Sequence, residues 1–175
     1  MQLAITLLGS RSKKFVTETL FSISECQCTI LEISCNQLGK AMAAHLLIEG
    51  NWNHIAKFEN CLEAIQKRLE IQTHTLRIDK SSDESMNGIP YSLEIIGLDQ
   101  ENIVQTIITF LERNTIAIQE FHASRYQASY NQSLIFSGKF IVIIPKESAL
   151  LSIREQFLDF CDQLNIDAIL EPIKR

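Results

Sequence analysis

The feature that most constrains this chain is an internal repeat of a strand–helix–strand unit. In residues 91–126 an apolar run reaches Gly97, apolar residues then recur at helical spacing, and a second apolar run follows. A shift of 88 residues superposes Gly97 on Gly9 and needs no gap from Leu3 to Asn36. A shift of 95 residues superposes a later helical stripe on another, namely Ile55, Phe58, Leu62, Ile65 and Leu69 on Leu150, Ile153, Phe157, Phe160 and Leu164. Two consistent registers predict a duplicated module.

Each copy predicts the element order βαββαβ. In the first copy we expect strands at 3–8, 28–35, 41–49 and 71–78, with one helix ending near Glu25 and the other near Glu70. This order is that of the ferredoxin-like fold, an α+β fold in which an antiparallel sheet carries its helices on one face. The difference between the two shifts predicts seven additional residues in the second copy, which we place at 125–133.

The predicted domain boundaries follow from one polar segment. Residues 79–90 are rich in Ser, Asp and Gly and have no apolar period, so they predict a linker between module 1 (1–78) and module 2 (91–175). In a ferredoxin-like sheet the second and fourth strands lie at the edges and carry unpaired backbone groups. We therefore expect the modules to associate through sheet edges, either within one chain or as a homo-oligomer.

Charge and composition argue against several classes of partner. The 175 residues carry a net charge of −5 and no long basic run, which disfavours direct binding to nucleic acid. No stretch reaches the roughly 18 uninterrupted apolar residues of a membrane span. The N-terminus lacks the features of a signal peptide. Five cysteines without a secretory signal favour a reducing, cytoplasmic setting.

No catalytic or metal-binding pattern is apparent. Cys26 and Cys28 are closely spaced, but zinc sites usually combine paired C-x2-C spacings into four ligands, and the four histidines are scattered. The carboxylates Asp99 and Glu101 lie in a turn, where we interpret Asp99 as a helix cap. The sequence therefore predicts a protein that is not an enzyme, with no metal and no cofactor.

The two turns between the first strand and first helix of each module are the candidate binding sites. A helix N-terminus there offers free N–H groups and a positive dipole end, which suit a carboxylate. An alternative left open is a solvated turn without a ligand. The candidate residues are Ser10, Arg11 and Ser12 in module 1 and Asp99, Gln100 and Asn102 in module 2.

The tandem pattern resembles the ACT domain, and several motifs are similar to those of the glycine cleavage system transcriptional repressor family. These motifs are Leu7-Leu8-Gly9, Cys26-x-Cys28, Leu38-Gly39, Gly50-x-Trp52-Asn53 and Cys161-x-x-Leu164-Asn165. The resemblance implies two ACT modules, no DNA-binding domain, contact with a LysR-type transcriptional activator and glycine or another amino acid as signal. An alternative is a regulatory subunit that acts in trans on an enzyme of amino-acid metabolism.

The turns depart from the pattern Asp-Arg-Pro-Gly-Ile-Val that ACT modules commonly carry there. The glycine position holds Lys14 in module 1 and Asn102 in module 2. Because glycine permits close approach of the backbone to a ligand, its loss predicts weak or absent glycine binding. If a ligand binds, Arg11 would pair with its carboxylate and Asp99 with its ammonium group; alternatively, Arg11 and Asp99 would pair with each other.

Overall fold

The computed structural model describes residues 1–10, 14–78, 88–129, 132–146 and 150–173, and these fall into two units. Unit 1 spans Met1–Asp83 and unit 2 spans Glu84–Arg175. Each unit has its own apolar core.

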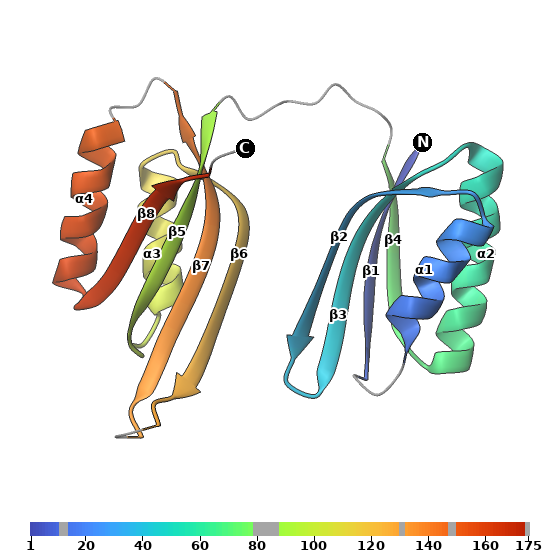
Figure 1. Cartoon of the computed structure of the whole chain (residues 1–175), viewed down its shortest axis with the longest axis horizontal. Helices are drawn as coiled ribbons and strands as arrows, with labels where there is room; N and C mark the ends of the chain where they lie inside the picture. The colour runs from blue at the N-terminus through green and yellow to red at the C-terminus, as the bar shows by residue number, and fades with distance from the viewer. Residues whose placement is uncertain (11–13, 79–87, 130–131, 147–149, 174–175) are drawn as a thin grey trace. The chain divides into compact units, whose positions relative to one another are not determined.

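Unit 1 is a four-stranded antiparallel sheet with both helices on one face (Figure 1). The strand order is β2-β3-β1-β4, so β2 and β4 form the edges. Alternate residues of β1 point to the helices, and Leu3, Ile5 and Leu7 are buried there. The elements are β1 (Gln2–Ser10), α1 (Phe15–Glu25), β2 (Thr29–Leu38), β3 (Ala41–Glu49), α2 (Trp52–Leu69) and β4 (Gln72–Ile78).

Unit 2 repeats this architecture with the strand order β6-β7-β5-β8. Its elements are β5 (Gly88–Leu98), α3 (Ile103–Arg113), β6 (Ala117–Gln127), β7 (Leu134–Pro145), α4 (Leu150–Gln163) and β8 (Ile166–Pro172). The predicted α+β fold, two ferredoxin-like βαββαβ modules in tandem, is therefore confirmed. Strand β5 begins at Gly88, within the segment that the sequence indicated as linker, and 79–87 lie outside the described residues.

Gly9 and Gly97, at matching positions of the two units, have no room for a side chain. A Cβ on Gly9 would lie 2.6 Å from Cγ2 of Ile71, and a Cβ on Gly97 would lie 2.6 Å from Cγ2 of Ile166. Contacts this short do not occur between real carbon atoms, so a side chain at either position would displace the first residues of the neighbouring edge strand. The repeat of Gly9 and Gly97 therefore reflects packing between β1 and β4 and between β5 and β8.

The backbone of unit 2 follows that of unit 1 in fine detail. Both second strands carry an irregularity in pairing at the same place, after Ile30 in β2 and after Ile118 in β6. In the central strands, Thr6 pairs with His45 and Glu94 with Lys139, so the offset changes from 88 (6 to 94) to 94 (45 to 139) across the β6–β7 connection. Six of the seven additional residues therefore lie in that connection, and one lies between β7 and α4.

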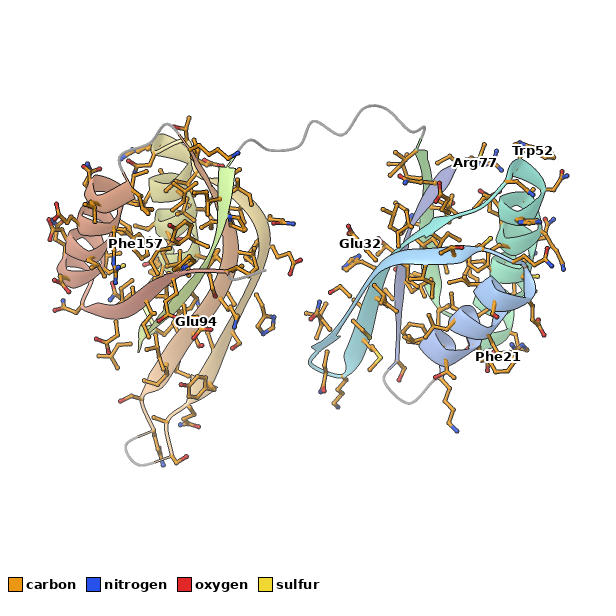
Figure 2. All side chains as sticks on the ribbon, turned by 45° about the horizontal axis from the view of Figure 1, so that its top comes forward. Phe21, Glu32, Trp52, Arg77, Glu94 and Phe157 are labelled. Carbon is orange, nitrogen blue, oxygen red and sulfur yellow. The ribbon has the colours of Figure 1, made fainter. Side chains whose placement is uncertain are left out.

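The predicted helical stripes form the two cores. In α2, Ile55, Phe58, Leu62 and Ile65 are buried, and in α4 Ile153 and Phe157 are buried. Phe157 points into the interior of unit 2 (Figure 2), where its ring lies 5.6 Å from that of Phe110 on α3. Aromatic pairs at this distance contribute beyond the area they bury. Among the described helices, none is long and apolar enough to cross a membrane.

Candidate functional site at the start of α3

The described part of the first predicted site is a strand end. Ser10 is the last residue of β1 and pairs with Ala41 of β3, and Arg11 and Ser12 lie outside the described residues. Lys14 precedes α1 with a φ of −79° and a ψ of 35°, and its side chain makes no capping hydrogen bond. All residues of the second turn, 99–102, are among the described residues.

Hydrogen bonds hold the second turn to two distant parts of unit 2. The backbone N–H of Asp99 donates to the carbonyl of Leu134 at the start of β7, at 2.9 Å. The side-chain amide of Gln100 donates to the carbonyl of Leu164, just beyond α4, at 2.5 Å. Because these partners come from distant parts of the sequence, the turn is fixed by tertiary contacts as well as by its own residues.

Asp99 forms an ion pair with Arg125 of β6, with Nε of Arg125 2.9 Å from Oδ1 of Asp99. The Asp99 side chain is 13% exposed and that of Arg125 is 62% exposed. Oδ1 has no access to solvent, and although Nε is close, the N–H is not aligned well enough for a hydrogen bond. A buried carboxylate oxygen thus lies beside an exposed guanidinium and can still accept a hydrogen bond.

The expectation that Asp99 caps the helix is wrong. Helix α3 begins at Ile103, and the residue at its N-cap is Asn102. The Asn102 side chain makes no capping hydrogen bond. The Asp99 carboxylate is directed to Arg125 instead, so the N-terminal N–H groups of α3 receive no carboxylate from this turn.

Asn102 explains how the turn forms without the glycine of the ACT pattern. Its φ of 60° and ψ of 17° lie in the left-handed region, which glycine adopts freely. Among other residues, asparagine tolerates this region best. Asn102 thus has a backbone conformation that glycine would adopt freely, whereas Lys14 at the matching position of unit 1 has a negative φ.

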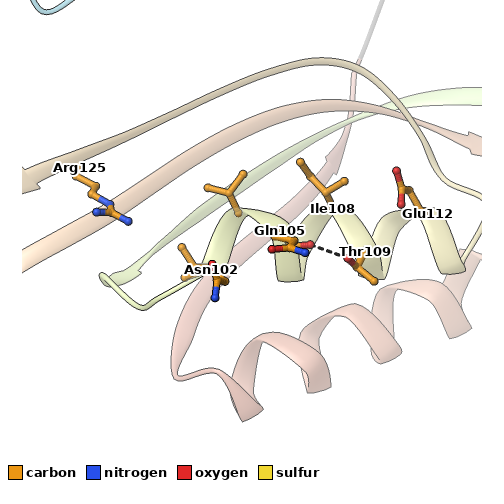
Figure 3. Close-up of a pocket in the computed structure, with 8 residues that line it drawn as sticks. Asn102, Gln105, Ile108, Thr109, Glu112 and Arg125 are labelled. Atoms are coloured by element: carbon orange, nitrogen blue, oxygen red, sulfur yellow. Dashed lines mark hydrogen bonds between the residues drawn. The ribbon is translucent and has the colours of Figure 1, made fainter.

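A hollow of about 600 Å³ lies beside the first three turns of α3 and reaches Arg125. Figure 3 shows Arg125 extending from β6 toward the N-terminal end of α3. Polar and apolar residues alternate along the helix, with Val104 and Ile108 as apolar contacts and Thr109 and Glu112 as polar ones toward its C-terminal end. The lining residues are Asn102, Ile103, Val104, Gln105, Ile108, Thr109, Glu112 and Arg125.

The charges of the hollow are arranged for a small zwitterion. The helix N-terminus and the Arg125 guanidinium are both positive and suit a carboxylate. Two carboxylates suit an ammonium group: Glu112, which lines the hollow, and Asp99, which does not line it but is paired with Arg125. Asn102 and Arg125 line the hollow, Asp99 is linked to it through the ion pair with Arg125, and the Gln100 side chain donates to Leu164 instead.

Comparison with known proteins agrees with this architecture. Residues 1–75 match the ACT domain family. A protein of unknown function from Galdieria sulphuraria is 18% identical, with a TM-score of 0.77 over 99% of this chain and 98% of that one. A protein provisionally described as a glycine cleavage system transcriptional repressor is 17% identical, with a TM-score of 0.73 over the same shares. Among curated protein sequences, none matches this chain.

Both units are thus ACT-like modules. At these identities the likeness to the two solved structures shows the fold, and it extends over the second unit as well as the first. The family match covers residues 1–75, in unit 1. The turn of unit 1 departs further from the ACT sequence pattern than the turn of unit 2 does.

Arg125 is the site residue that the sequence did not reveal. It lies in the segment where we placed the additional residues, yet the structure puts it on β6, opposite Phe136 of β7. The C-terminal end of β6 comes close to the turn before α3, and this proximity follows from the pairing of β6 with β7 and not from the sequence pattern. Within the residues that the structure describes, no three His, Cys, Asp or Glu side chains cluster as metal ligands would.

Proposed function

We propose that this chain is a non-enzymatic regulatory protein that binds an amino acid at the start of α3 and acts through contact with a LysR-type transcriptional activator. The observation that carries the first half is the pairing of a buried Asp99 oxygen with the exposed Arg125 guanidinium at a helix N-terminus. Groups of opposite charge held this close can bind both ends of an amino acid.

In the proposed complex the ligand ammonium group donates to Asp99, and the ligand carboxylate accepts from Arg125 and from the first N–H groups of α3. The ligand would thereby separate or bridge the existing ion pair. Because Val104 and Ile108 form the adjacent wall, the site favours glycine or an amino acid with a small apolar side chain. Asn102 has a left-handed backbone, which glycine would adopt freely, but its side chain lines the hollow. The prediction of weak glycine binding from the missing turn glycine therefore stays a prediction, which the titration below tests.

Calorimetric titration of the full chain with glycine and a panel of amino acids tests this site. Removing one charged partner in Asp99→Asn or Arg125→Gln should weaken binding on the order of tenfold to a hundredfold. Arg154→Gln, on an exposed part of α4, is the matched control and should leave binding unchanged. Absence of binding across the panel, or equal affinity in Asp99→Asn and the wild type, would reject the proposed site.

The second half of the proposal is supported by likeness over the whole chain to the protein described as a glycine cleavage system transcriptional repressor. The net charge of −5 fits action through a protein partner and not through DNA. Affinity capture with the full chain should therefore retain a LysR-type activator. Recovery of an enzyme of amino-acid metabolism would support the alternative role as a regulatory subunit, and a salt-dependent gel shift by the chain alone would contradict the absence of DNA binding.

We also propose that a sheet edge mediates self-association. All ten residues of edge strand β2 are exposed, and Ile30, Ile33 and Leu38 are 38%, 47% and 58% exposed. Exposed apolar side chains beside unpaired backbone groups favour pairing with another edge. Light scattering should detect an oligomer that Ile33→Lys dissociates and Leu151→Lys, at an exposed position of α4, does not. A monomer at every concentration would contradict this proposal.

A further inference from the structure

Two cysteines from different helices lie close together in unit 1. The thiol of Cys26, directly after α1, donates to the sulfur of Cys61 in α2, and the two sulfurs are 3.9 Å apart. The residues are 35 positions apart in the sequence, so the contact is tertiary. A disulfide requires a sulfur separation near 2.05 Å, which is a short movement from this starting point and lies within the reach of side-chain rotation.

The two thiols differ in access. Cys26 is 2% exposed, whereas Cys61 is only partly buried. Burial, followed by the hydrogen bond to Cys61, raises the pKa of Cys26 to about 11, although the nearby Lys57 charge acts in the opposite direction. Cys61 is therefore the thiol that a reagent can reach. Among the described residues, Cys26 is the only cysteine whose thiol forms a hydrogen bond with Cys61.

We propose that Cys26 and Cys61 form a reversible regulatory disulfide on reaction with a small-molecule disulfide such as oxidised glutathione. In the first step the Cys61 thiolate attacks the reagent, forms a mixed disulfide and releases one equivalent of thiol. In the second step Cys26 loses its proton to solvent and attacks the Cys61 sulfur, which releases the second equivalent. Two protein thiols are oxidised, and one molecule of the reagent is reduced to two thiols.

The other cysteines are placed differently. The Cys28 sulfur contacts the backbone carbonyl of Cys26 at 3.8 Å, Cys35 is exposed on β2 and Cys161 is buried in unit 2. The new bond would join the end of α1 to the middle of α2, the two helices that cover the sheet of unit 1. Oxidation would thereby restrict the motion of α1, which contacts edge strand β2, relative to α2, which contacts edge strand β4.

Peptide mapping of the full chain after incubation with oxidised glutathione tests the proposal. We expect a peptide that links Cys26 to Cys61, with loss of two hydrogen atoms, that disappears on reduction. Cys61→Ser should abolish this cross-link and leave Cys26 unmodified, because Cys26 is buried. Cys35→Ser is the matched control and should leave the cross-link intact. A stable mixed disulfide on Cys61, or a cross-link between Cys26 and Cys28, would overturn the proposal.

A second measurement does not depend on any variant folding. A loop closed between residues 26 and 61 should raise the melting temperature of unit 1 by on the order of 10 °C in the oxidised wild-type chain, with no rise in unit 2. The shift should be lost after addition of reductant. Oxidation that leaves the melting temperature of unit 1 unchanged or lowers it would contradict a bond formed without distortion.

Discussion

The two units have the same strand order and the same pairing irregularity, but they differ at the turn that precedes the first helix. In unit 2, Asn102 has a left-handed backbone and Asp99 is paired with Arg125. In unit 1, Lys14 has a negative φ of −79° at the matching position. The comparison shows that this turn can change while the sheet stays the same, because the buried residues of sheet and helices, and not the turn, hold the fold together.

A second difference lies inside the helices. Ile107 of α3 is fully buried, and the matching residue of α1 is Thr19, which is equally buried. The Thr19 hydroxyl has no hydrogen-bond partner among the described residues. Edge strand β4 also carries Thr73, which is half-buried, where β8 has Ala168. Unit 1 therefore has a more polar interior side than unit 2.

The largest expected effects come from the stripe residues that the units share. Phe157→Ala should destabilise unit 2 by about 3–5 kcal/mol and Leu62→Ala should destabilise unit 1 by about 2–5 kcal/mol, because each leaves a cavity in a packed core. Leu151→Ala, at a position that is 77% exposed, is the control and should change stability by less than about 0.5 kcal/mol. Hydrogen exchange resolved by unit measures each value, and equal effects of Phe157→Ala and Leu151→Ala would contradict burial of the stripe.

Exchanging the helix residues tests the second difference. Ile107→Thr should destabilise unit 2 by about 2 kcal/mol, since it removes packing and buries an unpaired hydroxyl. Thr19→Val, which replaces that hydroxyl by a methyl group, should stabilise unit 1 by about 1 kcal/mol. Urea unfolding followed separately in each unit measures both. Loss of stability in Thr19→Val would mean that the hydroxyl has a partner in solution.

Alkaline pH should weaken both units through one buried thiol in each. Burial raises the pKa of Cys161 to about 12 and that of Cys26 to about 11, above the ordinary value of 9.0. Because unfolded thiols ionise first, stability is complete below pH 9.0 and is lost as pH rises toward the folded pKa. The maximum slope is about 1.4 kcal/mol per pH unit for each thiol. Denaturation between pH 8 and 10 should show a shallower slope for unit 2 in Cys161→Ala, and an unchanged slope would contradict this assignment.

The smallest expected effect concerns the turn itself. Asn102→Ala should destabilise unit 2 by about 1 kcal/mol, because alanine disfavours the left-handed backbone, and Asn102→Gly should be close to neutral. Lys14→Ala, at a position of negative φ in unit 1, is the matched control and should have almost no effect. Thermal denaturation compares the three variants. A cost at Lys14 equal to that at Asn102 would remove the proposed difference between the turns.

Much of the fold followed from local patterns in the sequence. The apolar stripes predicted which faces of α2 and α4 are buried, and the repeated glycines marked matching points of the two sheets. Boundaries were less accurate, since β5 begins at Gly88 inside the expected linker. Composition could not reveal this, because Gly88 and Ile89 pair with Pro145 and Ile144, residues more than fifty positions away.

The sequence by itself determined the duplicated βαββαβ fold, because periodicity records which side chains must leave water and is carried by neighbouring residues. Tertiary structure alone decided that Asp99 pairs with Arg125 and does not cap α3, and that Cys26 meets Cys61. Asp99 and Arg125 are 26 positions apart in the sequence, and Cys26 and Cys61 are 35 positions apart. They depend on strand register and helix packing, which fix distances that no local pattern contains.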